Sequence, residues 1–112
     1  MLISVVIPMF NEAQHIGRTL EGLKRAASHY AGQAELIVVD NGSSDASVSI
    51  AQQVGARVMV HPGIRVGALR NRGAAAAQGE IVAFVDADIE VAEGIRRIKP
   101  LFAETLSYEI HA

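Results

Sequence analysis

The stretch Gly79-Glu80-Ile81-Val82-Ala83-Phe84-Val85-Asp86-Ala87-Asp88 decides the fold. Its apolar run, residues 81–85, is typical of a strand that is buried on both faces. Two carboxylates with one residue between them follow, where the strand leaves the sheet. Negative charges this close repel each other, and a divalent cation is the simplest group that would compensate for the repulsion. The stretch therefore predicts a buried strand that ends at a metal site.

Three further segments are mainly apolar in the same way, although the first contains Ser4 and the third begins with Arg57. They are residues 2–8, 36–39 and 57–60, each short and rich in Val, Ile or both. Each is expected to form a strand covered on both faces. Pro8 has no backbone N–H, so we expect it to end the first strand.

The segments between these strands indicate helices. Apolar residues recur at helical spacing over residues 16–30 and 48–54, and residues 67–78 are rich in small side chains. We therefore expect three helices that alternate with the strands. Four residues are expected to mark their ends: Asn11 and Asp45 as N-caps of the first two, Gly55 and Gly79 at the ends of the last two.

Strands that are buried on both faces and alternate with helices form a parallel sheet with right-handed crossovers. The chain has 112 residues, of which 50% are apolar and 20% charged, so it is expected to form one α/β domain. We place the core of this domain at residues 1–91. Residues 92–112 are expected to form a helical tail.

Charge and composition argue against some classes of binding partner. The net charge of −2 gives no field that favours nucleic acid or an anionic membrane. No apolar stretch is long enough to span a bilayer, and residues 1–9 lack the basic region of a signal peptide. The sequence contains no cysteine, which fits a reducing compartment, and we expect a cytoplasmic protein.

Polar residues follow the carboxyl end of each predicted strand. In a parallel sheet these ends meet at one edge, which is where such sheets bind ligands. We therefore expect one site at this edge. The residues that follow the four strands in turn are Phe10, Asn11 and Glu12, then Asp40 and Asn41, then His61, then Asp86 and Asp88. His61, next to Pro62, is interpreted as a loop residue and not as a ligand.

The sequence excludes a P-loop domain and disfavours a dinucleotide-binding domain and a phosphorylated receiver domain. The chain has no Gly-x-x-x-x-Gly-Lys-Ser/Thr and no Gly-x-Gly-x-x-Gly after its first strand. It also lacks the acidic pair of a phosphorylated receiver domain. What remains is a nucleotide held by loops and carboxylates, with its phosphates bridged by a metal. An Asp-x-Asp pair suits Mg²⁺ or Mn²⁺.

Four segments together carry a family resemblance. They are Val6-Ile7-Pro8-Met9-Phe10-Asn11-Glu12, Val38-Val39-Asp40-Asn41-Gly42-Ser43-Ser44-Asp45, Arg70-Asn71-Arg72-Gly73, and residues 79–88. In this order the chain resembles the amino-terminal, nucleotide-binding half of family-2 glycosyltransferases with the GT-A fold. The resemblance implies a Rossmann-like three-layer sandwich with strand order 3-2-1-4. It also implies a nucleoside-diphosphate sugar as donor, a divalent metal, and transfer with inversion.

The resemblance also implies roles for single residues. Pro8, Phe10, Asn11 and Glu12 would line the nucleoside pocket, with Glu12 near the ribose. Asp40 would accept a hydrogen bond from the base, either uracil or guanine. Arg70 would lie near the diphosphate. Asp88 would bind the metal, and Asp86 would hold the ribose or a metal-bound water.

Several of these residues also have simpler interpretations. Asp40 is equally well explained as a turn former, and Asn11 as mainly a helix cap. Arg70 could be a surface residue of its helix. Asn41 stands where the family commonly has Asp, which leaves Asp40 to carry the role.

Members of the family continue well past the Asp-x-Asp, with an acceptor site and a general-base carboxylate. Glu93, Glu104 and Glu109 are read as a solvated face, so the acceptor and the catalytic base remain unassigned. We expect a chain that is truncated relative to its relatives. It would be either a glycosyltransferase domain or a nucleotide-sugar-binding module that is incomplete for catalysis. A bare edge at the fourth strand, or the segment 101–110, is expected to form a homodimer.

Overall fold

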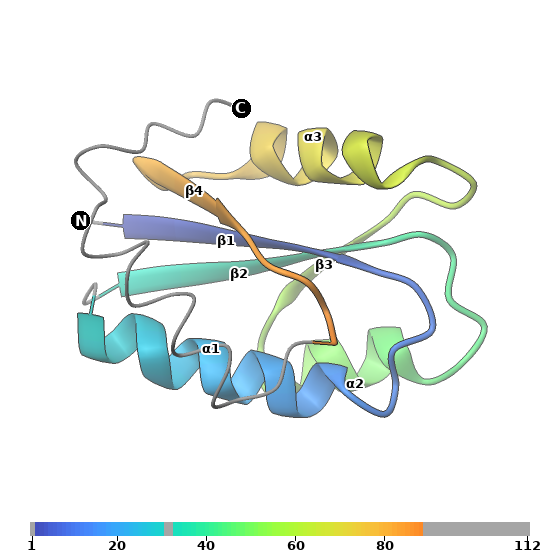
Figure 1. Cartoon of the computed structure of the whole chain (residues 1–112), viewed down its shortest axis with the longest axis horizontal. Coiled ribbons are helices and arrows are strands. Elements are labelled where there is room, and N and C mark those ends of the chain that lie inside the picture. The colour runs from blue at the N-terminus through green and yellow to red at the C-terminus, as the bar shows by residue number, and fades with distance from the viewer. Residues whose placement is uncertain (1, 31–32, 89–112) are drawn as a thin grey trace.

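The computed structural model describes residues 2–30 and 33–88. Strands and helices alternate along the chain (Figure 1), and all pairings between neighbouring strands are parallel. The order in the four-stranded sheet is β3-β2-β1-β4, which confirms the predicted order. The elements are β1 (Leu2–Met9), α1 (Ile16–Tyr30), β2 (Gln33–Asp40), α2 (Ser47–Val54), β3 (Arg57–Val60), α3 (Val66–Ala76) and β4 (Ile81–Phe84).

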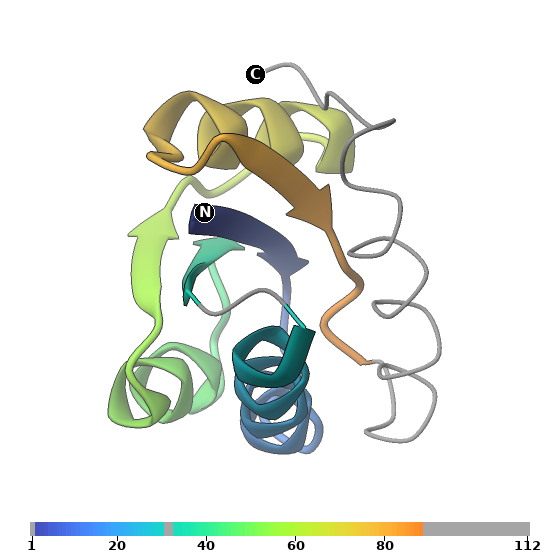
Figure 2. The ribbon, with the colours of Figure 1, turned by 90° about the vertical axis from the view of Figure 1, so that its left-hand side faces the viewer.

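The sheet lies between two helical layers. Figure 2 shows α3 on one face, with α1 and α2 on the other. Successive side chains of a strand point to opposite faces, so β1 sends Val5 and Ile7 toward the cluster that includes α1 and α2, and Val6 toward α3. In β2, Val38 and Val39 divide in the same way. β1 and β4 are mainly apolar because both of their faces are covered. The expectation that residues 57–60 are covered on both faces was wrong: β3 is an edge strand, and its Arg57 and Val60 are exposed. Among the described residues no helix is long and apolar enough to cross a membrane.

Pro8 ends the pairing of β1 on one side only. The expectation that it ends the strand was wrong, because β1 continues to Met9 and Pro8 pairs with Val39 of β2. Pairing with β4, in contrast, ends at Val6 and Phe84. The carbonyl of Val6 faces β4, where it accepts a hydrogen bond from Val85, and Pro8 faces the same side because backbone direction alternates along a strand. Its missing N–H therefore removes no hydrogen bond to β2.

Gly79 does not end α3, contrary to the prediction. The helix ends at Ala76, and Ala77 is already extended with φ −68° and ψ 137°. The backbone N–H of Gly79 donates to Ser4 Oγ at 2.8 Å. A Cβ at this position would lie 2.7 Å from the backbone nitrogen of Ser4 and 2.8 Å from the carbonyl oxygen of Leu2. Gly79 therefore lets the chain approach the start of β1 closely. The predicted tail, residues 92–112, lies outside the described residues, which end at residue 88.

We predict that Gly73→Ala destabilises the fold. A Cβ at position 73 would overlap Val6 Cγ1 and lie 2.9 Å from Val39 Cγ2, and both valines are fully buried. Overpacking of this kind typically costs about 1–3 kcal/mol. Chemical denaturation should show a corresponding fall in the free energy of unfolding.

The matched control for this change is Gly67→Ala in the same helix. Nothing lies within 4 Å of a Cβ at position 67, and alanine favours helix more than glycine does. Gly67→Ala should leave stability unchanged or raise it. Equal loss of stability in both variants would contradict the close packing of α3 on the sheet.

Candidate functional site

The predicted site residues gather at the carboxyl edge of the sheet. The loops that follow β1, β2 and β3 lie together at the right of Figure 1. Two backbone hydrogen bonds extend the sheet into these loops: Asn41 N–H donates to the Met9 carbonyl at 2.8 Å, and His61 N–H donates to the Asp40 carbonyl at 2.7 Å. The first residues after the three strands are thus fixed relative to one another.

Asn11 connects the loop after β1 to the loop after β2. Its backbone has φ 51°, in the left-handed region that Asn tolerates better than most residues. Its side-chain Oδ1 accepts a hydrogen bond from Ser44 N–H at 2.8 Å, and its own N–H donates to Ser43 Oγ at 2.8 Å. The helix α1 begins only at Ile16, so the prediction that Asn11 is its N-cap was wrong. The side chain binds a neighbouring loop instead.

Asp45 and Ser47 form a second connection between these loops. Asp45 Oδ2 accepts a hydrogen bond from Ala13 N–H at 3.2 Å, and Asp45 Oδ1 accepts from Ser47 N–H at 2.9 Å and from the Ser47 hydroxyl. Ser47 Oγ accepts from Glu12 N–H at 2.8 Å. Ala46 is the N-cap residue of α2, so the prediction of Asp45 as N-cap was wrong by one residue.

Asp40 holds the turn at the end of β2. Its side chain is buried, with 1% exposed. Oδ2 accepts hydrogen bonds from the N–H groups of Gly42 at 3.0 Å and Ser43 at 2.8 Å, and Oδ1 accepts from the Ser43 hydroxyl at 2.5 Å. The turn-forming interpretation is therefore observed. A role toward a nucleotide base stays a prediction.

Glu12 and His15 lie side by side at the start of α1. Glu12 Oε2 and His15 Nδ1 are 2.9 Å apart, and both side chains are partly exposed. The Glu12 carbonyl accepts hydrogen bonds from His15 N–H and Ile16 N–H. Phe10 is 53% exposed and Pro8 is half-buried. Polar and aromatic surface is thus available along the loop after β1.

Asp86 and Asp88 follow β4 with alternating burial. Val85 and Ala87 are buried, whereas both aspartates are exposed. Thr19 of α1 is buried and its hydroxyl donates to the Ala87 carbonyl at 2.9 Å. Within residues 2–30 and 33–88, no three His, Cys, Asp or Glu residues lie close enough together to hold a metal ion. The pair can supply carboxylate oxygens, and other ligands must complete a site.

Arg70 lies one turn into α3, which follows the loop after β3. Its Nε atom is buried and, within the described part of the chain, has no hydrogen-bond partner. A buried donor without a partner is costly, and an anion would satisfy it. The side chain as a whole is half-buried, so the interpretation of Arg70 as a simple surface residue does not account for it.

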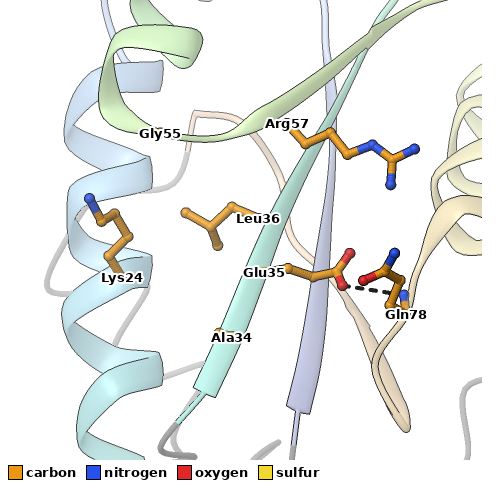
Figure 3. Close-up of a pocket in the computed structure, with 7 residues that line it drawn as sticks. All are labelled: Lys24, Ala34, Glu35, Leu36, Gly55, Arg57 and Gln78. Atoms are coloured by element: carbon orange, nitrogen blue, oxygen red, sulfur yellow. Dashed lines mark hydrogen bonds between the residues drawn. The ribbon is translucent and has the colours of Figure 1, made fainter.

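A cavity of about 450 Å³ lies at the other end of the sheet (Figure 3). Its polar groups already have partners: Glu35 Oε2 accepts from Gln78 N–H, Lys24 Nζ donates to the Val54 carbonyl, and Arg57 Nη1 donates to the Ala76 carbonyl. The cavity lies where β2 extends past the start of β3, which pairs from Ile37 onward. We interpret it as a gap at the sheet margin, far from the predicted site residues.

Residues 4–106 match the family model described as glycosyl transferase family 2. The chain belongs to this family. Its order of strands agrees with the GT-A fold that the resemblance implied.

Two relatives illustrate the range of the family. The chain is 34% identical over 96 residues to an undecaprenyl-phosphate 4-deoxy-4-formamido-L-arabinose transferase of Pseudomonas savastanoi pv. phaseolicola, covering 79% of this chain and 28% of that protein. It is 36% identical over 95 residues to the glucosyl-3-phosphoglycerate synthase of Mycolicibacterium smegmatis, covering 78% of this chain and 31% of that protein. The matched region thus spans less than a third of the length of these relatives.

A solved structure gives the same result for the fold. The glucosyl-3-phosphoglycerate synthase of Mycobacterium tuberculosis, in complex with Mn²⁺, UDP and glucosyl-3-phosphoglycerate, matches with a TM-score of 0.77 and 31% identity. The match covers 96% of this chain and 40% of that one. The same synthase has also been solved with Mg²⁺ and UDP.

The hydroxyl side chains that hold the loops of the candidate site were not identified from the sequence. Ser43, Ser47 and Thr19 hold the loops after β1, β2 and β4. Serines in a loop rich in turn formers are ordinary, and a threonine in a helix carries no site signal. Only Thr19 could have been singled out from the sequence, because its helical spacing from Ile16 and Leu20 places it on the inner face of α1, where a polar side chain needs a partner.

We predict that Asp45 contributes stability that is lost in acid. The Ser47 hydroxyl, followed by the backbone N–H groups of Ser47 and Ala13, lowers the pKa of the Asp45 carboxyl below its ordinary value of 3.8. A carboxyl whose pKa is lower in the folded state stabilises the fold above pH 3.8, and this contribution disappears as the pH falls through the lowered pKa. The stability difference between wild type and Asp45→Asn should therefore shrink on acidification.

Chemical denaturation over a pH series measures this difference. Ser47→Ala removes the hydroxyl that contributes most to the lower pKa, so its stability should depend less on pH in the acid range than that of the wild type. A difference between wild type and Asp45→Asn that stays constant to about pH 2 would show that Asp45 is not linked to folding in this way.

Proposed function

We propose that this chain binds a nucleoside-diphosphate sugar, UDP- or GDP-linked, as the donor-binding part of an inverting glycosyltransferase. The observation that carries the proposal is the exposed pair Asp86 and Asp88, which follows β4 and flanks the buried Ala87, whose carbonyl accepts a hydrogen bond from Thr19 of α1. Membership of the family supports the reaction class. The synthase of known structure that binds UDP with Mn²⁺ or Mg²⁺ supports the ligand class.

The residues present fit a divalent metal. Asp88 would bind the ion, and Asp86 would hold a metal-bound water or the ribose. Carboxylate oxygens are the ligands that Mg²⁺ and Mn²⁺ prefer, and both ions share their coordination with substrate phosphates. When bound, such an ion would offset the charge that develops on the departing diphosphate. Within the described residues no group of three His, Cys, Asp or Glu could hold the ion, so donor oxygens and water would have to supply the remaining ligands.

The nucleoside would lie on the loop after β1. Pro8, Phe10, Asn11 and Glu12 would line its pocket, and Glu12 would bind near the ribose. Asp40 would accept a hydrogen bond from the base. Because Asp40 is a buried residue and its carboxylate already accepts three hydrogen bonds, this contact requires a remaining lone pair or a small shift of the turn.

Arg70 would bind the diphosphate. Its buried Nε without a partner among the described residues is the supporting observation. A guanidinium binds phosphate oxygens through several N–H donors in a fixed geometry. Arg70 would thereby balance part of the negative charge that the donor brings beside Asp86 and Asp88.

The acceptor and the catalytic base are not assigned. An alternative to transfer is a nucleotide-sugar-binding module that binds the donor but does not transfer the sugar. The observation that keeps this alternative open is the extent of the match, which covers 28% to 40% of the compared proteins. The two functions differ in whether nucleoside diphosphate is released from the donor.

We predict that Asp88→Ala lowers the affinity for UDP in the presence of Mn²⁺ by at least about tenfold, because it removes a charged metal ligand. Asp86→Ala should weaken binding as well. Isothermal titration calorimetry with UDP and GDP, each with and without Mn²⁺, measures the effect. Release of UDP from UDP-sugars distinguishes the transferase from the binding module.

The matched control is Glu80→Ala. Glu80 is an exposed carboxylate that lies just before β4, at the opposite end of the same strand from Asp86 and Asp88. Its removal changes the net charge equally and should leave nucleotide affinity unchanged. If neither UDP nor GDP binds the wild-type chain with Mn²⁺, the proposed function is wrong.

We also propose a homodimer, on a different observation. Within the described sheet β4 is an edge strand that pairs with β1. Apolar strand edges favour pairing with another chain. Sedimentation velocity should therefore show a dimer that forms with rising concentration. Phe84→Pro should weaken it, because Val85 N–H donates to β1 and the N–H of the preceding residue faces the free edge. A monomer at all concentrations would contradict this proposal.

A further inference from the structure

Three consecutive backbone N–H groups of the loop after β1 point at one neighbouring loop. Asn11 N–H donates to Ser43 Oγ, Glu12 N–H to Ser47 Oγ, and Ala13 N–H to Asp45 Oδ2, at 2.8, 2.8 and 3.2 Å. Three side chains of the segment 43–47 thus satisfy donors that no helix satisfies, since α1 begins at Ile16. Unpaired, such donors would leave the loop free to take other conformations.

The two serines act in the same way. A serine hydroxyl has one hydrogen to donate and two lone pairs. Ser43 donates its hydrogen to Asp40 Oδ1, and Ser47 donates its hydrogen to Asp45 Oδ1. With the hydrogen directed at a carboxylate, the lone pairs of each Oγ are left for the N–H of Asn11 or Glu12. Each aspartate therefore fixes the direction of one serine, and each serine fixes one N–H of the loop after β1.

We propose that Asp45 and Ser47 are positioning residues for the donor nucleotide, which they do not touch. Ser47 is fully buried, so its effect on a ligand must pass through the backbone of Glu12. This inference rests on the proposed function, in which residues 10–12 line the nucleoside pocket. Asp45 and Ser47 hold that pocket in its binding geometry before the donor arrives, and binding then costs less ordering of the loop.

Variants of Asp45 and Ser47 test a positioning role without removing a predicted ligand contact, whereas variants of Asp40 and Ser43 do not. Asp40 is itself a candidate for direct contact with the base, so a change there affects both roles. Asp45 accepts from Ala13 and Ser47, and the Ser47 hydroxyl lies between Asp45 and Glu12. A change at Ser47 therefore removes one hydrogen bond to the loop after β1, and none of the predicted contact residues is itself substituted.

The test is Ser47→Ala, with Ser49→Ala as its matched control. Ser49 lies on the same helix, is exposed, and its hydroxyl donates to the Ala46 carbonyl. Affinity for UDP with Mn²⁺ is measured by calorimetry, and amide hydrogen exchange is measured by NMR. For Ser47→Ala we expect faster exchange at Glu12 and Ala13, unchanged exchange in β1 and β2, and about a tenfold loss of affinity. Ser49→Ala should match the wild type.

Asp45→Asn provides a second variant. It keeps one oxygen acceptor but loses the charge, so it should give a smaller change than Asp45→Ala in both measurements. Unchanged exchange at Glu12 in Ser47→Ala would overturn the inference, and so would faster exchange with unchanged affinity. If wild-type chain binds no UDP or GDP, the proposed function fails, and the exchange rates alone then decide whether Asp45 and Ser47 hold the loop.

Discussion

The parallel pairing of β1 with β2 is the constraint on which the rest of the molecule depends. It is continuous from Leu2 and Gln33 to Met9 and Asp40, and the hydrogen bond from Asn41 N–H to the Met9 carbonyl extends it into the loops. A shift by one residue would turn every buried side chain of β1 to the wrong face. It would also separate the N–H groups of residues 11–13 from their acceptors at 43–47. The same register thus fixes both the core and the geometry of the candidate site.

The sheet was predictable from the sequence, whereas the helix ends were not. Continuous runs of Val and Ile identify strands covered on both faces, and alternation with helices makes them parallel. Cap residues, however, were assigned from local preference, and tertiary hydrogen bonds decided otherwise. Asn11 binds the Ser43–Ser44 segment, and Gly79 allows the chain to approach Ser4. Gly55, where no such competitor acts, does end α2 in the left-handed conformation.

The carboxylates of the site were predictable for the same reason as the strands. A charged residue directly after a buried strand lies at the carboxyl edge of the sheet, where its charge can reach solvent. The side chains that hold the loops were not predictable, because their role depends on which loop they face. Ser47 is an ordinary first residue of a helix until its hydroxyl is seen between Asp45 and Glu12. The sequence pattern therefore predicts where the carboxylates lie, whereas the side chains that hold their loops are identified only from the structure.

The geometry of Asp86 and Asp88 bears on how metal and nucleotide would bind. Two carboxylates cannot complete the octahedral coordination that Mg²⁺ requires, and within the described residues no third acidic or imidazole ligand is near enough. Under the proposed function the remaining ligands are diphosphate oxygens and water. The ion and the nucleotide would then each raise the affinity for the other by the same factor, because such coupling is reciprocal. The hydrogen bond from Thr19 to Ala87 would serve this coupling by holding both aspartates at the edge where the nucleoside loop begins.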